Sequence, residues 1–316
     1  MNGALGVSAV VLNYSGRHLL EVILPSLAAQ QPPLDEIVVV DNGSRDDSVD
    51  WLAAHWPHVK VVALPENVGV TAALNVCLRA ACGEVVVLFN NDMEIDSSCV
   101  RELVAALEQH PEAGVAAAKL LDFRDRDRLD GAGDAYTWSG EANRRGQGDR
   151  DEGQFDMPEE VFAACGGAAA YRRSAIEAVG EFDEQLFAIY EDVDWSFRAR
   201  LLGYTCRYVP SARVYHLGSA TIGQGLSDFA LYQNWRNGIW VLAKNYPPAA
   251  LIRYGHRFVN AQAHNLVWAL QTRHVGVFLR VWRDALRGMP AVLRKRRRVQ
   301  RARTVGLGEL KRVIAR

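Results

Sequence analysis

Four short hydrophobic runs occur in the first 90 residues, and longer segments with helical spacing separate them. The runs cover residues 7–12, 37–40, 59–63 and 85–89. Each is apolar without strict alternation, which is typical of a strand buried on both faces of a parallel sheet. Between them, residues 19–30 and 71–81 have the spacing of amphipathic helices. This alternation predicts an α/β fold with a doubly wound, mostly parallel sheet.

Polar residues follow all four runs. Asn13 follows the first run and Asp41 the second, Asn67 lies just past the third, and Asn91 and Asp92 close the fourth. The carboxyl ends of parallel strands meet at one edge of a sheet, and ligands bind there. A polar residue at one strand end is ordinary turn chemistry. Four such ends together predict a binding site.

A less regular pattern begins at residue 122. Residues 122–160 have no periodicity and are rich in Asp, Arg and Gly. Two interpretations are open: a mobile solvated insertion, or a segment that binds the acceptor or closes the site, since long loops in compact domains are often functional. Order returns at residue 161, where Gly166 and Gly167 would let the backbone approach a ligand or would permit a bulge.

Beyond residue 219 the pattern is helical and basic. An apolar stripe with arginines on the opposite face is formed by Val275, Leu279, Trp282 and Leu286, and RKRRR follows at 294–298. From residue 251 onward there are 16 Lys and Arg but only two acidic residues, although the net charge of the whole chain is -1. Such a helix packs on its own domain or lies on an anionic membrane. The charge, with Trp268 and Phe278 interleaved, favours the membrane.

Composition excludes several classes. The chain has 316 residues, of which 49% are apolar and 23% charged, as in soluble globular proteins. Five scattered cysteines without a CxxC pair indicate reduced thiols rather than a disulfide framework. No basic leader precedes the first apolar run, and no stretch reaches the ~18 apolar residues that cross a bilayer. The acidic first 250 residues would repel nucleic acid. We therefore expect a cytoplasmic protein, peripheral on the inner face of the cell membrane.

Two groups of acids suggest chemistry. Asp92 ends an apolar strand, where a carboxylate-held Mg²⁺ or Mn²⁺ would neutralise a diphosphate leaving group. Alternatively, it caps a helix that begins near residue 97. Glu191 and Asp192 are adjacent acids at the start of a helix, a position suited to a general base. Asp194 is explained by a surface pair with Arg198 at i,i+4 spacing.

One histidine also follows an apolar segment. His216 comes directly after residues 208–215. A lone histidine after a strand is more often structural. Its neutral imidazole would nevertheless suit Mn²⁺ as a ligand, so both roles remain open from the residue alone.

Taken in order, these motifs resemble those of the inverting glycosyltransferase family 2, whose members have the GT-A nucleotide-sugar fold. The matching segments are VVLNYSG at 10–16, IVVVDNGSRDDS at 37–48, ENVGVTAALN at 66–75, LFNNDMEI at 88–95, CGGAAAYRR at 165–173, GEFDEQLFAIYEDVDWSFRARLLGY at 180–204 and VPSARVYHLGS at 209–219. They cover roughly two thirds of the chain, and the long block around Glu191 is the most specific.

The resemblance implies a role for each candidate residue. Asn13 and Asp41 match positions that contact the nucleoside. Asn67, Asn75 and Asn91 belong to the donor side. Asp92 matches the last acid of the family's Asp-x-Asp motif, whose first acid is replaced here by Asn90, so help from His216 as a metal ligand is expected. Asp192 matches the catalytic base, with Glu191 as the fallback.

The resemblance also implies a reaction and an organisation. A metal-dependent transferase would move a sugar from a nucleotide diphosphate-sugar to a hydroxyl of a glycan or lipid-linked glycan. Residues 1–121 would form the nucleotide-sugar-binding half, 122–219 the acceptor-binding and catalytic half, and 220–316 a basic helical C-terminal region. The motifs NWRN at 234–237 and KNYP at 244–247 resemble the rhamnosyltransferase-like branch, which builds bacterial surface polysaccharides.

Three alternatives concern function and assembly. A nucleotidyltransferase shares the alternating sheet but requires a glycine-rich basic loop after the first strand. The sequence NYSGRH at that position matches such a loop poorly. A non-catalytic nucleotide-sugar-binding module tethered to the membrane is also open, and so is a homo-oligomer. A dehydrogenase is disfavoured because no GxGxxG follows any strand.

Overall fold

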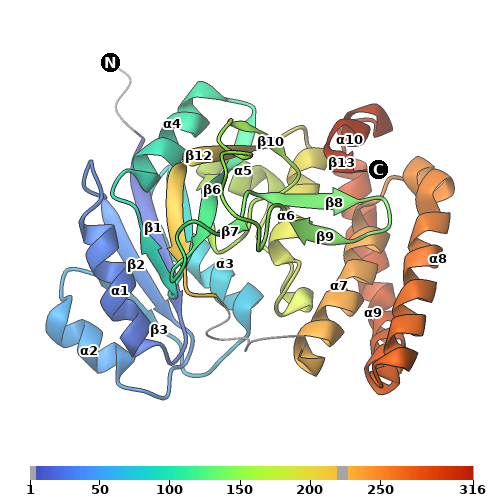
Figure 1. The fold of residues 1–316 in the computed structure, drawn as a ribbon, viewed down its shortest axis with the longest axis horizontal. Helices are drawn as coiled ribbons and strands as arrows, with labels where there is room; N and C mark the ends of the chain where they lie inside the picture. Colours follow the sequence, from blue (N-terminus) through green and yellow to red (C-terminus); the bar gives the residue numbers. More distant parts are fainter. Residues whose placement is uncertain (1–4, 219–226, 316) are drawn as a thin grey trace.

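The computed structural model describes residues 5–218 and 227–315 (Figure 1). Its centre is a ten-stranded sheet, in which the predicted runs form four parallel neighbours in the order β4, β1, β2, β3. These strands are β1 (Val7–Asn13), β2 (Glu36–Asp41), β3 (Lys60–Ala63) and β4 (Val85–Asn90). The helices between them are α1 (Arg17–Ala28), α2 (Ser48–His55) and α3 (Val70–Ala80). The prediction of a mostly parallel α/β sheet is confirmed.

Beyond β4 the sheet becomes mixed. Strand β11 (Ala168–Arg172) runs antiparallel between β4 and β6 (Ala113–Asp122), and β12 (Thr205–His216) runs parallel to β6 on its other side. Three short strands complete the sheet: β5 (Met93–Ile95) and β10 (Glu159–Val161) pair with β12, and β7 (Leu129–Gly131) pairs with the end of β6. The accompanying helices are α4 (Cys99–Gln109), α5 (Arg173–Val179), the 3-10 turn η1 (Glu184–Leu186) and α6 (Glu191–Leu201).

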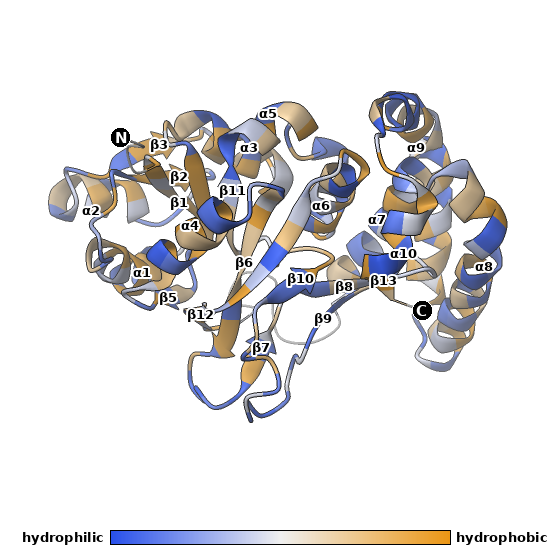
Figure 2. Ribbon diagram, turned by 90° about the horizontal axis from the view of Figure 1, so that it is seen from above, coloured by the Kyte–Doolittle hydropathy of each residue, from blue (hydrophilic) through white to orange (hydrophobic). Residues whose placement is uncertain are grey.

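Hydrophobic cores lie on both faces of this sheet. On one face, Leu20 and Ile23 of α1 and Leu103 of α4 pack against the strands. On the other face, Leu74 of α3 and Trp195 of α6 do so. Figure 2 shows the two layers of helices with the strands between them. The strands are apolar on both sides because both sides are covered.

The segment 122–160 is built of short strands. Besides β7 it contains β8 (Asp134–Thr137) and β9 (Ala142–Arg144), which form an antiparallel hairpin. The C-terminal strand β13 (Ile314–Ala315) pairs in parallel with β8 and completes a second, three-stranded sheet. An unstructured loop therefore does not describe this segment. Strands of three or four residues are too short to produce a visible hydrophobic period.

The C-terminal region is helical, as expected. It contains α7 (Asp228–Asn245), α8 (Pro248–Gln271), α9 (Val275–Ala302) and α10 (Leu307–Val313), which stand beside the sheet in Figure 1. Ser219 and residues 220–226, included in the predictions, lie outside the described residues. Within the described residues, no helix combines the length and the apolarity needed to cross a membrane.

The face of α9 that packs inward differs from the predicted apolar stripe. Val277, Val281 and Ala285 are buried, whereas Leu279 and Leu286 are each 62% exposed. A helix with hydrophobic residues on more than one face must choose which face to bury, and the spacing alone did not decide this.

Candidate functional site

The first two strand ends are joined by a buried polar network. The Asn13 side-chain amide donates to Asp41 Oδ2 at 2.8 Å, and the Asn91 amide donates to Asn13 Oδ1 at 2.7 Å. Ser44, which the sequence did not single out, donates its backbone N–H and its hydroxyl to Asp41 at 2.8 and 2.5 Å. The structure thus brings together three of the predicted donor-side residues and fixes the carboxylate of Asp41.

Asn67 and Asn75 make different contacts. The side-chain oxygen of Asn67 accepts hydrogen bonds from Gly69 N at 2.9 Å and from the side-chain amide of Asn42 at 3.2 Å. These bonds order the turn before α3. Asn75 is buried in α3, and its side chain donates to Phe182 O at 3.0 Å and accepts from Phe182 N at 2.8 Å. Asn75 therefore ties α3 to the segment before α6, and direct contact with a donor remains a prediction for both residues.

Asp92 and His216 lie together because their strands pair. His216 is opposite Met93 in the β5–β12 pair, so the neighbouring Asp92 reaches the imidazole, with Oδ2 3.3 Å from Nε2. The other carboxylate oxygen, Oδ1, is buried without a hydrogen-bond partner. The alternative that Asp92 caps the next helix is wrong. Helix α4 begins at Cys99, and Asp96 accepts the hydrogen bonds of Ser98.

These two side chains fit a divalent cation. An unpartnered carboxylate oxygen beside an imidazole nitrogen is a donor set that Mn²⁺ accepts. Among the described residues, no group of three or more His, Cys, Asp and Glu side chains is arranged to hold a metal. The protein would therefore supply only part of the coordination and leave positions for phosphate oxygens.

The protonation of His216 reflects its two acidic neighbours. Burial alone would lower the pKa of the imidazole, but hydrogen bonds to Asp130 and Asp92 outweigh this and raise it to about 9. The ring lies between both carboxylates, with Nδ1 2.8 Å from Asp130 Oδ2. A metal ion at Nε2 would replace the proton there, because a coordinating imidazole must be neutral.

Glu191 and Asp192 occupy the first turn of α6. Asp192 accepts hydrogen bonds from Gly166 N at 2.8 Å and from Val193 N at 2.7 Å. Burial raises the pKa of Asp192, and these N–H groups and Arg144 act in the opposite direction. Burial and then the charge of Asp192 raise the pKa of Glu191 to about 8. The two N–H donors favour the charged form of Asp192, whereas Glu191 Oε2 is buried without a hydrogen-bond partner, so Asp192 is the better placed of the two carboxyls to act as a base.

The glycines before β11 explain how the Asp192 carboxylate is held. A Cβ added to Gly166 would lie 3.0 Å from Asp192 Cβ, so a larger residue would press on the side chain to which this backbone N–H donates. The next residue, Gly167, accepts a hydrogen bond from Asn90 N at 3.0 Å. The region around Asp92 and the region around Asp192 are therefore neighbours across the end of β4.

The turn before Glu191 is strained. Phe187, Ile189 and Tyr190 have φ values of 66°, 65° and 75°, a region that non-glycine residues rarely adopt. The buried amide of Asn237 donates to the carbonyls of this turn at Leu186, Ala188 and Ile189, at 3.0, 2.8 and 2.7 Å. The NWRN motif thus acts on the segment that presents Asp192, a role that sequence analysis missed although it singled out the motif.

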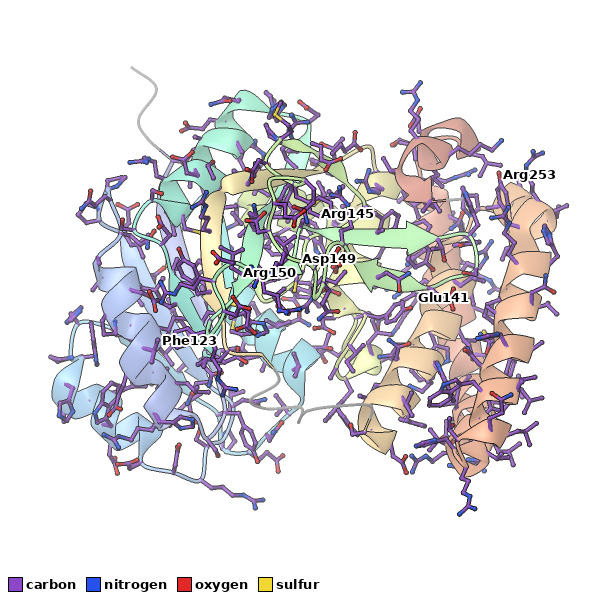
Figure 3. All side chains as sticks on the ribbon, in the orientation of Figure 1. Phe123, Glu141, Arg145, Asp149, Arg150 and Arg253 are labelled. Carbon is purple, nitrogen blue, oxygen red and sulfur yellow. The ribbon has the colours of Figure 1, made fainter. Side chains whose placement is uncertain are left out.

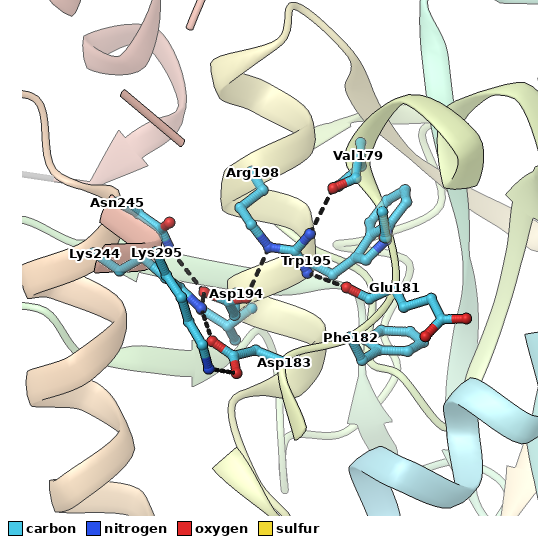
Figure 4. A network of polar contacts seen from close by, with 12 residues as sticks. Val179, Glu181, Phe182, Asp183, Asp194, Trp195, Arg198, Lys244, Asn245 and Lys295 are labelled. Carbon is cyan, nitrogen blue, oxygen red and sulfur yellow. Dashed lines mark hydrogen bonds and ion pairs between the residues drawn. The ribbon is translucent and has the colours of Figure 1, made fainter. Parts of the chain in front are cut away.

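Asp194 belongs to a buried ionic cluster, not to a surface pair. It accepts a hydrogen bond from Arg198 at 2.9 Å, as the spacing predicted, but its side chain is fully buried. Lys244 lies 2.8 Å from Asp194 and also contacts Asp183, and the Asn245 amide donates to Asp194 at 2.8 Å (Figure 4). The KNYP motif therefore anchors α7 to α6, and the prediction of a surface pair is wrong because α7 covers it.

The segment 122–160 contributes residues that the sequence did not identify. Asp130 contacts His216, and Arg144 donates to Asp130 at 2.7 Å. Asp134 is buried with its Oδ1 unpartnered, and burial followed by the charge of Asp192 raises its pKa to about 7. Figure 3 shows other charged side chains of this segment, such as Arg145 and Asp149, in front of the sheet. In an irregular stretch full of Asp and Arg, no sequence signal distinguishes the functional members.

Comparison with known proteins shows a family match. The family described as "Glycosyl transferase family 2" matches residues 8–180. An uncharacterized protein y4gI of Sinorhizobium fredii is 28% identical over 60% of this chain, a match that spans only 22% of the relative. The N-acetylglucosaminyl-diphospho-decaprenol L-rhamnosyltransferase of Mycobacterium tuberculosis is 27% identical, and 68% of this chain and 77% of the relative are covered. The dTDP-rhamnosyl transferase RfbF of Shigella flexneri is 26% identical, with coverage of 68% and 73%.

Solved structures share the fold. A GalNAc-T7 structure with UDP, GalNAc and Mn²⁺ is similar with a TM-score of 0.63 and 20% identity, over 77% of this chain and 48% of that one. The mannosyltransferase PcManGT from Pyrobaculum calidifontis, in complex with GDP-Man and Mn²⁺, has a TM-score of 0.55 and 19% identity, over 90% and 76%. The fold of this chain is thus shared with these glycosyltransferase structures.

Proposed function

This chain belongs to glycosyltransferase family 2, and from that premise we propose that it transfers a sugar from a nucleoside diphosphate-sugar to a hydroxyl group, with Asp192 as the general base. The observation that carries the proposal is the setting of Asp192. Its carboxylate is held by two backbone N–H groups, next to the end of β4 where Asp92 lies. A fixed carboxylate at that edge, whose charged form these N–H groups favour, is suited to accept a proton from an acceptor hydroxyl.

The reaction is a single displacement with inversion. Asp192 takes the proton of the acceptor hydroxyl as its oxygen attacks the anomeric carbon, and the bond to the nucleoside diphosphate breaks. Asn13, Asp41 and Asn91 form the rigid network on which the nucleoside rests. Asn67 orders the turn on the donor side, and Asn75 holds the segment leading to α6.

Asp92 and His216 would hold a divalent cation, Mn²⁺ or Mg²⁺. The free Oδ1 of Asp92 and the Nε2 of His216 support this assignment. When bound, the cation would neutralise charge on the diphosphate. The imidazole favours Mn²⁺ over Mg²⁺, which prefers oxygen ligands.

The relatives suggest the substrates. The S. flexneri relative is named for a dTDP-rhamnosyl donor, and the M. tuberculosis relative for a lipid-linked N-acetylglucosaminyl diphosphate acceptor. We therefore propose rhamnose as the transferred sugar and a lipid-linked glycan as the acceptor, in the synthesis of a bacterial surface polysaccharide. A homo-oligomer remains a prediction from the sequence.

A donor panel with base variants tests the reaction. The protein is incubated with Mn²⁺, a lipid-linked N-acetylglucosaminyl diphosphate acceptor and nucleotide-sugars including dTDP-rhamnose, and nucleoside diphosphate release is measured. Asp192→Asn is expected to lower kcat by about 10²–10⁴ without changing donor affinity. Near-normal turnover by Asp192→Asn would exclude this residue as the base. In a separate reaction with a nucleoside triphosphate and a sugar 1-phosphate, release of pyrophosphate would favour a nucleotidyltransferase. Donor binding without turnover would favour a non-catalytic module.

A lipid-linked acceptor requires access to a membrane, and the outer helices offer a surface for it. Leu279, Leu286 and Leu293 of α9 are exposed and spaced seven residues apart, and Ile252 of α8 is 88% exposed. Arg283 and Arg287 are exposed nearby on α9. Apolar residues flanked by arginines suit an anionic bilayer. Two copies of this face would instead oppose their own positive charges, so we propose peripheral attachment to the inner face of the cell membrane.

Part of the basic cluster at 294–298 is engaged internally. Lys295 contacts Asp183, and Arg296 donates to Ala243 O at 2.8 Å. Removing the whole tail would therefore damage the domain. Flotation with anionic liposomes should instead compare the double variant Leu279→Asp and Leu286→Asp with Met157→Asp, which changes an apolar residue, 76% exposed, in the segment 122–160. Loss of binding only in the double variant is expected, and equal flotation would remove the membrane proposal.

A further inference from the structure

We propose that the segment 122–160 supports the metal site through Asp130, which fixes the orientation of His216, and through Arg144, which holds Asp130. This inference rests on the proposed function of Asp92 and His216 as metal ligands. Asp130 and Arg144 belong to β7 and β9, and neither strand supplies a ligand itself. Both are therefore positioning residues.

The strand order brings the three side chains together. Strand β12 pairs with β5 on one side, which places His216 beside Asp92. On its other side β12 pairs with β6, and β6 pairs with β7, which carries Asp130. Asp130 reaches across β6, and its Oδ2 lies 2.8 Å from His216 Nδ1.

The imidazole is held from both of its nitrogens. Nδ1 donates its hydrogen to Asp130, so Nε2 is the nitrogen that faces Asp92. A carboxylate behind a ligating histidine fixes the tautomer and the ring orientation and increases the basicity of the ligating nitrogen. Without Asp130 the ring could rotate about its side-chain bonds or carry its hydrogen on Nε2, which cannot then bind a cation.

Arg144 determines where the Asp130 carboxylate points. Its Nη1 donates to the same Oδ2 that accepts from His216, at 2.7 Å. To do so, the arginine side chain crosses over Gly131. A Cβ on that glycine would lie only 2.7 Å from Arg144 Cδ and Cγ. The sequence Asp130-Gly131 therefore provides both the carboxylate and the space for the residue that holds it.

Metal binding by purified variants tests the inference. Mn²⁺ is titrated without nucleotide, and the free ion is measured by electron paramagnetic resonance. Asp130→Ala is expected to raise the Kd about 10–100-fold, the range typical for removal of such a support. Asp130→Asn keeps an oxygen that can accept from Nδ1 and should show a smaller loss, and Arg144→Gln should weaken binding as well.

Controls separate this inference from the proposed function. Asp149→Asn removes an exposed carboxylate from the same segment (Figure 3) and should bind Mn²⁺ like the wild type. Asp92→Asn and His216→Ala should abolish binding. If they do so while Asp130→Ala binds normally, the support role is wrong and the metal ligands stand. If Asp92→Asn and His216→Ala also bind normally, the metal site is wrong and the inference falls with it.

Thermal unfolding without metal, and with saturating Mn²⁺, distinguishes support of the ligand from support of the fold. At the same Mn²⁺ concentration, Asp130→Ala should show a smaller Mn²⁺-dependent rise in Tm than the wild type, and Asp130→Asn a reduction between the two, whatever their Tm without metal. An undiminished Mn²⁺-dependent rise in both variants would overturn the inference.

Discussion

Replacing Asn237 by alanine removes the contact that holds the turn before Glu191 and Asp192. The amide of Asn237 donates to three carbonyls of this turn, and the side chain is completely buried. The side-chain oxygen of Asn237 accepts a hydrogen bond from Arg236 at 2.9 Å. The substitution therefore also leaves a buried arginine with fewer hydrogen-bond partners. The turn would then be free to leave its strained conformation.

The magnitude follows from the geometry. Leu186 O keeps hydrogen bonds from Ala188 N and Arg236, so the carbonyls of Ala188 and Ile189 are the two that lose the Asn237 donor, at about 1–3 kcal/mol each. A residue with positive φ stores about 1–3 kcal/mol, which is released if the turn relaxes there. Relaxation at one residue would offset about half of the lost hydrogen bonding, and we expect Asn237→Ala to lower the free energy of unfolding by about 2 kcal/mol. Because relaxation moves Asp192, and a misplacement of ~1 Å costs about 10²-fold, kcat should fall about 100-fold.

Two measurements and a matched control check this reasoning. Urea unfolding gives the free energy of unfolding, and steady-state kinetics of nucleoside diphosphate release gives kcat and KM at a temperature where each variant is folded. Asn234→Ala changes an exposed asparagine of the same NWRN motif on the same helix and should affect neither quantity. The donor KM should be nearly unchanged in Asn237→Ala, since the nucleoside network lies on other strands.

A fully active but destabilised Asn237→Ala would refute the reasoning, since the asparagine would then support only the fold. A stable variant with wild-type kcat would show in addition that the strained turn holds without it.

Three further outcomes are expected. Glu191→Gln should make the stability less dependent on pH. The pKa of Glu191 in the folded protein is about 8, above the ordinary 4.5, so the wild type loses stability as the pH rises between these values. Equal curves of Tm against pH for the two proteins would contradict the raised pKa of Glu191. Gly166→Ala should lower kcat because the new Cβ meets Asp192. The control Gly255→Ala places its Cβ in open space on α8 and should leave kcat unchanged. Urea unfolding should show that this control stabilises the protein by up to about 1 kcal/mol. Lys244→Met should lower the free energy of unfolding by about 3–5 kcal/mol, because Asp183 and Asp194 lose a shared buried cation. A loss below ~1 kcal/mol would show that Arg198 and Lys295 suffice to balance the charges of these two carboxylates.

The sequence predicted the parallel half of the sheet because burial on both faces leaves a direct signature in β1, β2 and β4, which appear as valine-rich runs. The edge strand β3 is only partly buried, but its run VVA is still apolar, and polar residues follow all four strands at the candidate site. Strand β6 was not predicted. Its sequence AGVAAAKLLD is rich in alanine, which favours helices, but β12 and β11 pair with it on both sides and override that preference.

The site was predictable to the extent that its residues lie in regular elements. Asp92, Asp192 and His216 stand at the ends of strands or at the start of a helix, where position suggests chemistry. Asp130 and Asn237 act through contacts between segments far apart in the chain, and such contacts leave no local pattern. The outward face of α9 was likewise decided by which partner helix it meets.

The pairing of β13 with β8 makes the order of synthesis relevant to folding. Ile314 lies beside Tyr136 although more than half of the chain separates them. During translation, the parallel half of the sheet can fold early, because N-terminal segments leave the ribosome first. The hairpin that carries Arg144 receives its outer strand only after residue 315 has emerged. A nascent chain can therefore complete its second sheet only after helices α7 to α10 have been synthesised, although the first two strands of that sheet lie in the first half of the chain.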